Sequence, residues 1–316
     1  MKRLLVLLLL LFAGSVPAAY PDKPLRVIHG FAPGGGADIF LRAVTPRLSD
    51  LLGQPVVIEY RTGAGGNLAM EAVAKAAPDG YTLLMGTPGL AINPALYQNL
   101  SFDPLKDLAP VSLIGSVPNV LIVTPSLAAA NLRELMAMAR AQPGKLNYSS
   151  SGTGTSLHLA GELFRLLAAI DVQHIPYKGG GQAQVDVMSG EAQFMFNVLP
   201  SALPQIRAGK LRALAVTGKA RSDALPEVPT MIEAGLPGYT ATTWNAILTT
   251  GGTSREAVTR LNEAVVRTMR SAEMKDALQK LGQDPAWSTP EELAAFMREE
   301  TDKWRKVIQA TGLKAQ

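Results

Sequence analysis

Two loops rich in glycine and serine carry the residue types with which this sequence could do chemistry. The first lies in GFAPGGGADIF, residues 30–40, where Gly34, Gly35 and Gly36 follow an apolar run and precede an amphipathic segment. The second, SSSGTGTS at residues 149–156, has the same context. A loop between a strand and a helix gathers unpaired N–H groups at the positive end of the helix dipole, and glycine lets a ligand approach them. Both loops are candidate anion sites, although the glycines of the first could serve only to form a tight turn.

A nucleotide phosphate is the first anion to test, and the spacing of the glycines argues against it. The Rossmann fingerprint GxGxxG needs a third glycine, but leucine stands there in both candidate stretches, at Leu68 and at Leu157. The Gly-Lys pairs at 144–145 and 218–219 lack the Ser or Thr that completes a Walker A loop. We therefore expect no nucleotide cofactor.

Serine hydrolysis is the second chemistry to test. The chain contains no GxSxG stretch, and the serines at 149–151 precede a glycine rather than stand between two. A base would have to be His29, His158 or His174. His158, three residues after Thr155, could form a Thr–His pair, but a histidine satisfied by its surroundings explains the spacing as well. Without HExxH or clustered carboxylates, we expect no catalysis, no metal site and no cofactor.

Reversible capture of a carboxylate is the function that the two loops favour. A carboxylate needs several N–H or O–H donors, and the second loop adds hydroxyl groups at Ser150, Ser151, Thr153 and Thr155. If each loop belongs to a different lobe of a hinged protein, closing the lobes removes the ligand from water. The sequence thus indicates a cleft that binds a small carboxylate compound.

The N-terminal residues 1–19 have the pattern of a secretory signal peptide. Lys2 and Arg3 precede the apolar run 4–12, and small residues end at Ala18 and Ala19. The alternative is a membrane anchor, but the run is shorter than the roughly 20 residues that span a bilayer. The chain has no cysteine, which excludes a lipid-attached lipoprotein and a disulfide framework. We expect cleavage near Ala18 or Ala19 and a periplasmic mature protein.

The charge of the mature chain excludes several partners. Removing the signal peptide leaves 28 basic against 26 acidic residues, a net charge of +2 in place of the precursor's +4. This small excess, without runs of like charge, predicts no binding to nucleic acid or to an anionic membrane. No later apolar stretch is long enough to span a membrane. We expect a soluble mature protein that is not embedded in the membrane.

The elements that must position the loops alternate between short apolar runs and helix-length amphipathic segments, which predicts an α/β fold with mostly parallel sheets. We expect strands at 25–29, 56–60, 81–85, 146–149, 172–176, 192–196 and 211–217. We expect helices at 37–52, 67–76, 132–141, 156–168, 181–189, 255–271, 272–281 and 290–311.

The length of the mature chain favours two lobes, because single cores stop growing near 250–300 residues. Apolar, proline-marked stretches at 117–125 and 236–248 could carry the chain between them. We expect lobe 1 to comprise residues 20–123 plus 237–316 and lobe 2 to comprise residues 124–236. Each lobe then contributes one of the two glycine loops.

Ordered blocks along the whole mature chain carry a resemblance to a known family. They begin with YPDKPLRVIHGFAPGGGADIFLR and continue through GQPVVIEYRTGAGGNLAMEAVAKAAPDGYTLLMGT, NYSSSGTGTSLHLAGELF and HIPYKGGGQAQVDVMSGEAQFMF to TPEELAAFMREETDKWRKVI. In this order they resemble the Bug family, the TctC-type substrate-binding proteins of tripartite tricarboxylate transporters. The resemblance implies a two-lobe periplasmic-binding-protein (Venus-flytrap) fold, type II-like, with a ligand cleft between the lobes and no catalysis.

The resemblance also implies the site residues. A ligand carboxylate is held by main-chain groups of two loops that match residues 31–38 and 150–155 here, with Phe31 as a wall and the glycines presenting N–H groups. Asp38 would brace its loop or cap the helix rather than touch the anion. The binding residues implied are Phe31, Gly34, Gly35, Gly36, Thr87, Ser150, Ser151, Gly152, Thr153, Gly154, Thr155 and His158.

The sequence departs from the family pattern at two further positions that we expect in the cleft. Asn197 stands where the family often has Asp, and losing that charge argues against an amino acid as the ligand. Asn245 and Ala246 stand where the family commonly has Tyr-Gly, which would change the size of the cleft.

The function that follows is that of a periplasmic receptor for a carboxylate compound. We expect a monomer that delivers its ligand to membrane transporter subunits encoded elsewhere. The alternative is a receptor that presents its bound solute to a sensor kinase, which would have the same fold. A third hypothesis is an exported hydrolase, but the sequence lacks a nucleophile motif.

Overall fold

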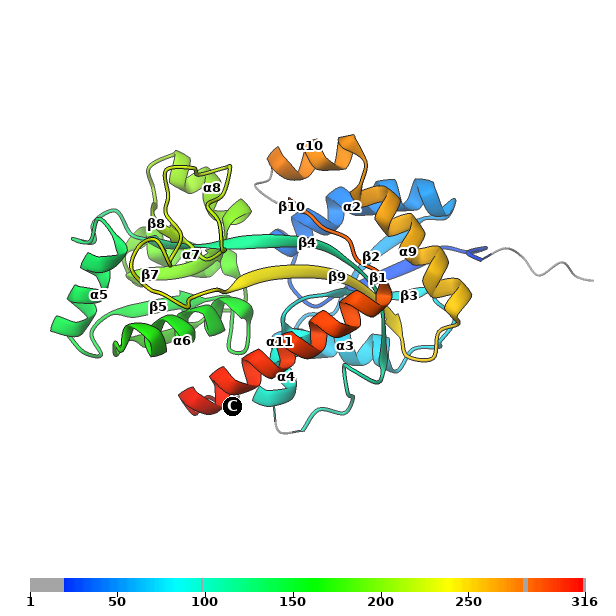
Figure 1. The fold of residues 1–316 in the computed structure, drawn as a ribbon, viewed down its shortest axis with the longest axis horizontal. Helices are drawn as coiled ribbons and strands as arrows, with labels where there is room; N and C mark the ends of the chain where they lie inside the picture. Colours follow the sequence, from blue (N-terminus) through cyan, green and yellow to red (C-terminus); the bar gives the residue numbers. More distant parts are fainter. Residues whose placement is uncertain (1–19, 98, 281–283, 315–316) are drawn as a thin grey trace, which may run out of the picture.

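The computed structural model describes residues 20–97, 99–280 and 284–314, so the predicted signal peptide lies outside the described residues. The fold is α/β with two lobes, seen side by side in Figure 1. One sheet continues through both lobes, in the order β2 (Val56–Tyr60), β1 (Leu25–His29), β3 (Thr82–Gly86), β9 (Thr242–Thr250), β4 (Leu108–Val123), β7 (Phe194–Val198), β5 (Asn147–Ser150) and β6 (Gln173–Pro176). We call the lobe with β1, β2 and β3 the first lobe and the lobe with β5, β6 and β7 the second lobe.

Two long strands, β4 and β9, connect the lobes across the middle of the molecule (Figure 1). β4 pairs with β9 from Leu108 to Pro118 and with β7 from Asn119 to Val123. Its register with β9 shifts at two bulges, which bend the strand. The connecting stretches expected near 117–125 and 236–248 overlap these strands at residues 117–123 of β4 and 242–248 of β9.

Each half of the sheet is mixed, which corrects the expectation of mostly parallel sheets. β1 is parallel to β2 and β3, and β5 is parallel to β6 and β7. β9 is antiparallel to β3 and β4, and β4 is antiparallel to β7, to β8 (Arg212–Val216) and to β10 (Asp284–Pro285). The physical reason is that one connecting strand enters the second lobe and the other returns from it. The two must therefore run in opposite directions.

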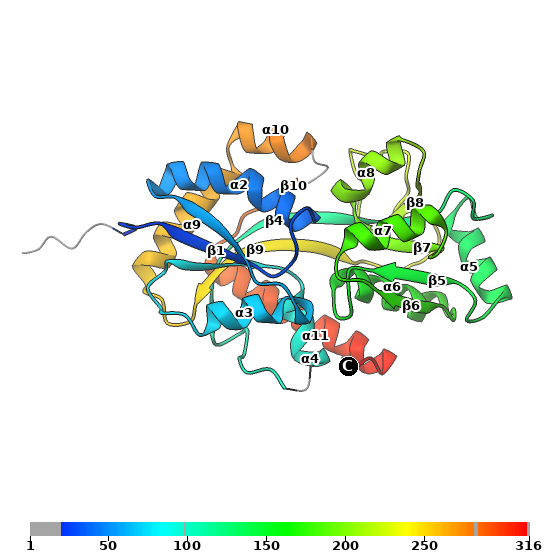
Figure 2. The ribbon, with the colours of Figure 1, turned by 180° about the vertical axis from the view of Figure 1, so that it is seen from behind.

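Helices cover both faces of the sheet, as Figures 1 and 2 show from opposite sides. In the first lobe one face packs against α2 (Gly36–Leu52), α9 (Arg255–Met269) and α10 (Ala272–Lys280), and the other against α3 (Asn67–Ala74), α4 (Gly89–Leu96) and α11 (Pro290–Thr311). In the second lobe α5 (Leu132–Ala141) and α6 (Ser156–Ala168) cover one face, and α7 (Gly180–Ser189) and α8 (Leu199–Arg207) cover the other. Within the described ranges, none of the helices combines the length and the hydropathy that a membrane crossing requires.

Candidate functional site

A cavity of about 890 Å³ lies where the two lobes meet. Three strand-to-helix junctions open onto it: β1–α2, β3–α4 and β6–α7. The start of α6, strands β7 and β9, the first half of α8, Val117 of β4 and Gly65 also contribute to the wall. Of the predicted site residues, those in the wall are Phe31, Gly34, Gly35, Gly36, Thr87, Ser151, Thr155, Asn197 and Asn245. Those outside the wall are Ser150, Gly152, Thr153, Gly154 and His158.

The lobes touch each other at two glycines, one of which, Gly36, lines this cavity. A methyl group placed on Gly36 of the first lobe would lie 2.5 Å from Cγ2 of Val198 in the second lobe. Likewise, a methyl group on Gly154 of the second lobe would lie 2.5 Å from Cδ2 of Leu96 in the first lobe. The absence of a side chain at these two glycines lets the lobes come into contact, and we call this conformation closed.

Loop A, residues 31–38, uses one of its glycine N–H groups internally. Gly34 has a φ of 88°, and its N–H donates to Oδ2 of Asp38 at 2.8 Å. This N–H is therefore not available to a ligand, which corrects the expectation that all three glycines present theirs. Gly36 and Ala37 occupy the first two positions of α2, where N–H groups have no partner within a helix, and both line the cavity.

Asp38 braces loop A from behind, as predicted. Its buried carboxylate accepts from Arg42 Nε at 3.0 Å and from the Tyr60 hydroxyl at 2.5 Å, besides Gly34. Burial opposes ionisation, but the hydrogen bonds from Gly34, Tyr60 and Arg42 outweigh it and lower the pKa of Asp38 below its usual range. Asp38 is thus a carboxylate whose charge is neutralised by Arg42, and it does not leave a free negative charge beside an anion site.

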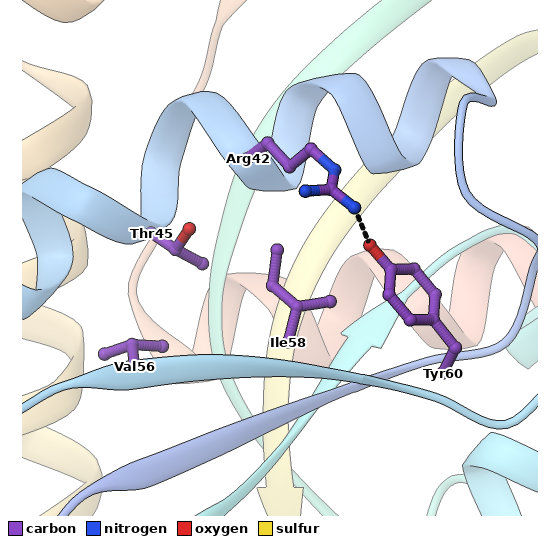
Figure 3. A pocket seen from close by; sticks show the side chains of 5 residues that line it. All are labelled: Arg42, Thr45, Val56, Ile58 and Tyr60. Atoms are coloured by element: carbon purple, nitrogen blue, oxygen red, sulfur yellow. Dashed lines mark hydrogen bonds between the residues drawn. The ribbon is translucent and has the colours of Figure 1, made fainter.

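The brace extends from the cavity to the surface of the first lobe. Arg42 and Tyr60 lie between α2 and β2 in a separate pocket of about 390 Å³, which Thr45, Val56 and Ile58 also line (Figure 3). Nη2 of Arg42 donates to the Tyr60 hydroxyl at 2.6 Å (Figure 3). This pocket is not part of the cavity between the lobes, since the two share no lining residue.

Loop B, residues 150–155, also consumes most of its polar groups internally. The N–H of Gly152 donates to Oγ of Ser150 at 3.1 Å, and the N–H of Gly154 donates to Nδ1 of His158 at 3.1 Å. Thr155 caps α6 by accepting from the N–H of His158 at 3.3 Å. The groups left for a ligand include the N–H groups of the next two residues, 156 and 157, which begin α6, and the hydroxyl of Ser151; all three residues line the cavity.

His158 lies behind loop B, stacked on His174 with ring centroids 3.8 Å apart. Burial lowers the pKa of His158 to about 3, helped by His174 and Arg165, and burial lowers the pKa of His174 to about 4. Nε2 of His174 lies 2.7 Å from Oγ of Ser150. That distance suits a nucleophile and its base, but Ser150 is fully buried and lies outside the cavity wall.

Sequence reasoning missed loop C, residues 178–182, at the start of α7. Lys178, the three glycines 179–181 and Gln182 line the cavity opposite loop A. Lys178 is the only residue with a fixed charge in the wall, and no aspartate or glutamate of the described residues lies there. The signal was available, because YKGGGQ follows a strand and precedes a helix as FAPGGGAD does.

Two asparagines and one histidine complete the polar wall. Asn197 is fixed by its neighbours: its Nδ2 donates to Gln184 at 2.7 Å and its Oδ1 accepts from the N–H of Val198 at 2.9 Å. Asn245 is 1% exposed, and its Oδ1 has no partner among the described residues. His29, which was not predicted, is fully buried with neither ring nitrogen paired within the described chain. These atoms could accept or donate hydrogen bonds to a ligand.

Comparisons with known proteins agree on one family. The family model described as "Tripartite tricarboxylate transporter family receptor" (TctC) matches residues 40–313. Protein BugT of Bordetella pertussis is 38% identical over 297 residues, which cover 93% of this chain and 91% of BugT.

Two solved structures place the fold in the same group. Rpa4515 of R. palustris with adipate is 35% identical and has a TM-score of 0.89; the match covers 93% of this chain and 99% of Rpa4515. MatC from Rhodopseudomonas palustris with bound malate is 32% identical and has a TM-score of 0.85; the match covers 92% of this chain and 100% of MatC. The resemblance drawn from the sequence is confirmed: the chain belongs to the Bug family of TctC-type periplasmic solute-binding proteins.

Proposed function

We propose that this protein captures a small carboxylate compound in the closed cavity between its lobes and delivers it to a tripartite tricarboxylate-type membrane transporter. The observation that carries the proposal is that α2 and α6, one from each lobe, begin at the same cavity. Residues 36–37 and 156–157, whose N–H groups have no partner within a helix, line this cavity, and no aspartate or glutamate of the described chain lines it. Adipate and malate in the two related structures support a carboxylate as the ligand.

Physical chemistry supports binding of an anion at this place. A helix N-terminus contributes about 0.3–1 kcal/mol to a neighbouring negative charge at the surface, and up to about 2 kcal/mol in a partly buried site. Here two termini act on one ligand inside a closed cavity, where water no longer competes for the N–H groups. Lys178 adds a positive charge to the wall. The carboxylate thus exchanges hydration for fixed donors that need no rearrangement.

The boundaries and the location belong to the same proposal. We place a signal peptide at residues 1–19 and the mature protein in the periplasm. Lobe 1 comprises residues 20–123 plus 237–316, and lobe 2 comprises residues 124–236. The course of β4 and β9 supports these boundaries, because both strands run from one lobe to the other. The mature protein acts as a monomer and performs no catalysis, which the burial of Ser150 supports.

A thermal-shift experiment on the mature protein tests the proposal. Malate, adipate and aromatic carboxylates are compared with amino acids and with neutral compounds of the same size. Ligand at a hundredfold excess over its Kd stabilises the native state by about 2.7 kcal/mol, so the melting temperature rises with the carboxylates. Stabilisation by neutral or cationic compounds alone would contradict the anion site. Hydrolysis of ester substrates by the wild-type protein that Ser150→Ala abolishes would contradict the absence of catalysis.

A further inference from the structure

Loops A and B are each held by the same kind of local hydrogen bond. In each, a glycine with positive φ precedes the N-cap residue, and its N–H donates to the side chain at the third helical position, four residues on. Gly34 (φ 88°) donates to Asp38 at 2.8 Å, and Gly154 (φ 81°) donates to His158 at 3.1 Å. The acceptor is a carboxylate in loop A and an imidazole in loop B. Protonation turns the nitrogen of the second acceptor into a positively charged donor.

The hydrogen bond from Gly154 fixes the tautomer of His158. Because Nδ1 accepts, it carries a lone pair, and the ring proton of the neutral histidine is on Nε2. The second imidazole, His174, lies against the first ring and contacts Ser150 at the other end of loop B. The two histidines therefore hold both ends of the loop, while neither side chain of the stacked pair lines the cavity.

We infer that His158, supported by His174, is a positioning residue for the ligand loop 150–155, and that carboxylate binding requires both imidazoles to be neutral. This inference rests on the proposed function. His158 touches no ligand: it orients Gly154 and thereby the N–H groups at the start of α6. Protonation of Nδ1 would place two donors against each other and release the loop.

The groups around the pair favour the neutral state. On α6, Glu162 lies with Oε1 3.9 Å from Nε2 of His158, which is too long for a hydrogen bond. Glu162 is held instead by the hydroxyl of Tyr148 on β5 at 2.7 Å and by Arg165 at 3.2 Å. Tyr148 also stacks on His174, and Phe194 of β7 stacks on Tyr148. Burial lowers the pKa of both histidines, to about 3 and about 4, in agreement with this environment.

The experiment compares two variants of His158 by calorimetric titration with malate and adipate at pH 7.5. His158→Asn keeps an oxygen near the place of Nδ1, whereas His158→Leu removes the acceptor. We expect the leucine variant to bind roughly tenfold more weakly, the usual effect of one lost hydrogen bond, and the asparagine variant to stay within about threefold of the wild type. Equal affinity of wild type and leucine variant would overturn the inference while leaving the proposed function intact.

The pH profile provides the readout that a merely structural role would not move. Between pH 5 and pH 3, the range in which the two histidines take up protons, the affinity of the wild type should fall more steeply than that of His158→Asn, because the ligand's own titration is common to both. Parallel profiles would contradict the inference.

Nitrogen NMR of the wild-type imidazoles covers the case in which a variant does not fold. An unprotonated Nδ1 on His158 at pH 7.5 is expected, and a protonated Nδ1 would refute the positioning role. Absence of binding of every carboxylate to the wild type refutes the proposed function instead, and the NMR result still tests the tautomer.

Discussion

The contact between Gly36 and Val198 offers a way to block closure without touching the chemistry of the site. In Gly36→Ala the new methyl group would lie 2.5 Å from Cγ2 of Val198 in the closed conformation. Overpacking of this kind costs about 1–3 kcal/mol. The clash arises only when the lobes meet, so the apparent affinity for a carboxylate should fall by roughly 5- to 150-fold. The open form should not be destabilised, because alanine suits a helix better than glycine.

Calorimetric titration with malate and adipate measures this effect, and small-angle scattering with and without ligand reports closure. The double variant Gly36→Ala/Val198→Ala removes the clashing methyl groups of valine and should recover most of the affinity. Gly181→Ala is a matched control, because that glycine also lies near a helix start in the cavity wall but a methyl group there meets no atom within 4 Å. Wild-type affinity and normal closure of Gly36→Ala would refute the reasoning.

Three further predictions concern the brace, the specificity and the pH dependence. Asp38→Asn should destabilise the fold by about 1–3 kcal/mol, because charge-assisted hydrogen bonds are lost. The variant should also bind carboxylates more weakly, because Asp38 fixes Gly34 in loop A. Urea unfolding measures the stability and calorimetric titration the affinity; if neither changes, Asp38 is not a brace. Asn245→Asp puts a carboxylate into the wall and should weaken malate binding at least roughly tenfold at pH 7.5, whereas undiminished affinity would place the ligand elsewhere. The three histidines stay neutral in the fold, with pKa values of about 3 to about 4 against 6.5 in the unfolded chain. As the pH falls, the unfolded state therefore takes up protons before the folded state does. The contribution of the histidines to the free energy of unfolding is fully present above pH 6.5 and declines as the pH falls towards 4. A urea midpoint that does not fall between pH 7.5 and pH 5 would contradict this direction of the pH dependence.

Sequence reasoning located the elements with strong local signals. The helices α5, α6 and α11 and the strands β1 and β2 have the bounds that the sequence predicts. Each of these helices begins with a side chain that caps it: Asn131, Thr155 and, as a capping box with Glu292, Thr289. Caps and hydrophobic period act within one turn, so they can be recognised without knowing the tertiary structure.

Elements with conflicting local signals were missed. The helices α4 and α8 contain Pro94 and Pro204, and proline usually indicates a loop. The strand β4 was not predicted, because only residues 117–125, which contain Pro118 and Pro125, were expected there, as a connection between the lobes. Its pairing with β9 and β7, far away in the sequence, makes it a strand. The mixed sheet follows from this long-range pairing and could not be deduced from the local β–loop–α rhythm.

The candidate site was predictable in place but not in hydrogen bonding. The glycine pattern indicated loops A and B because helix N-termini bind anions by a local mechanism. Which N–H groups remain free depends on whether side chains four residues away turn back, as Asp38 and His158 do. That choice is decided by Tyr60 and Arg42 on one side and by His174 on the other, all from contacts that the sequence does not display.

The central claim is that one carboxylate lies between the starts of α2 and α6 in the closed cavity. A crystal structure of the mature protein with malate or adipate, whichever raises the melting temperature more, tests it most directly. The account predicts carboxylate oxygens about 2.7–3.2 Å from main-chain nitrogens of residues 36–37 and 156–157. A ligand whose carboxylates contact neither helix start, or which lies outside the cavity between the lobes, would contradict it.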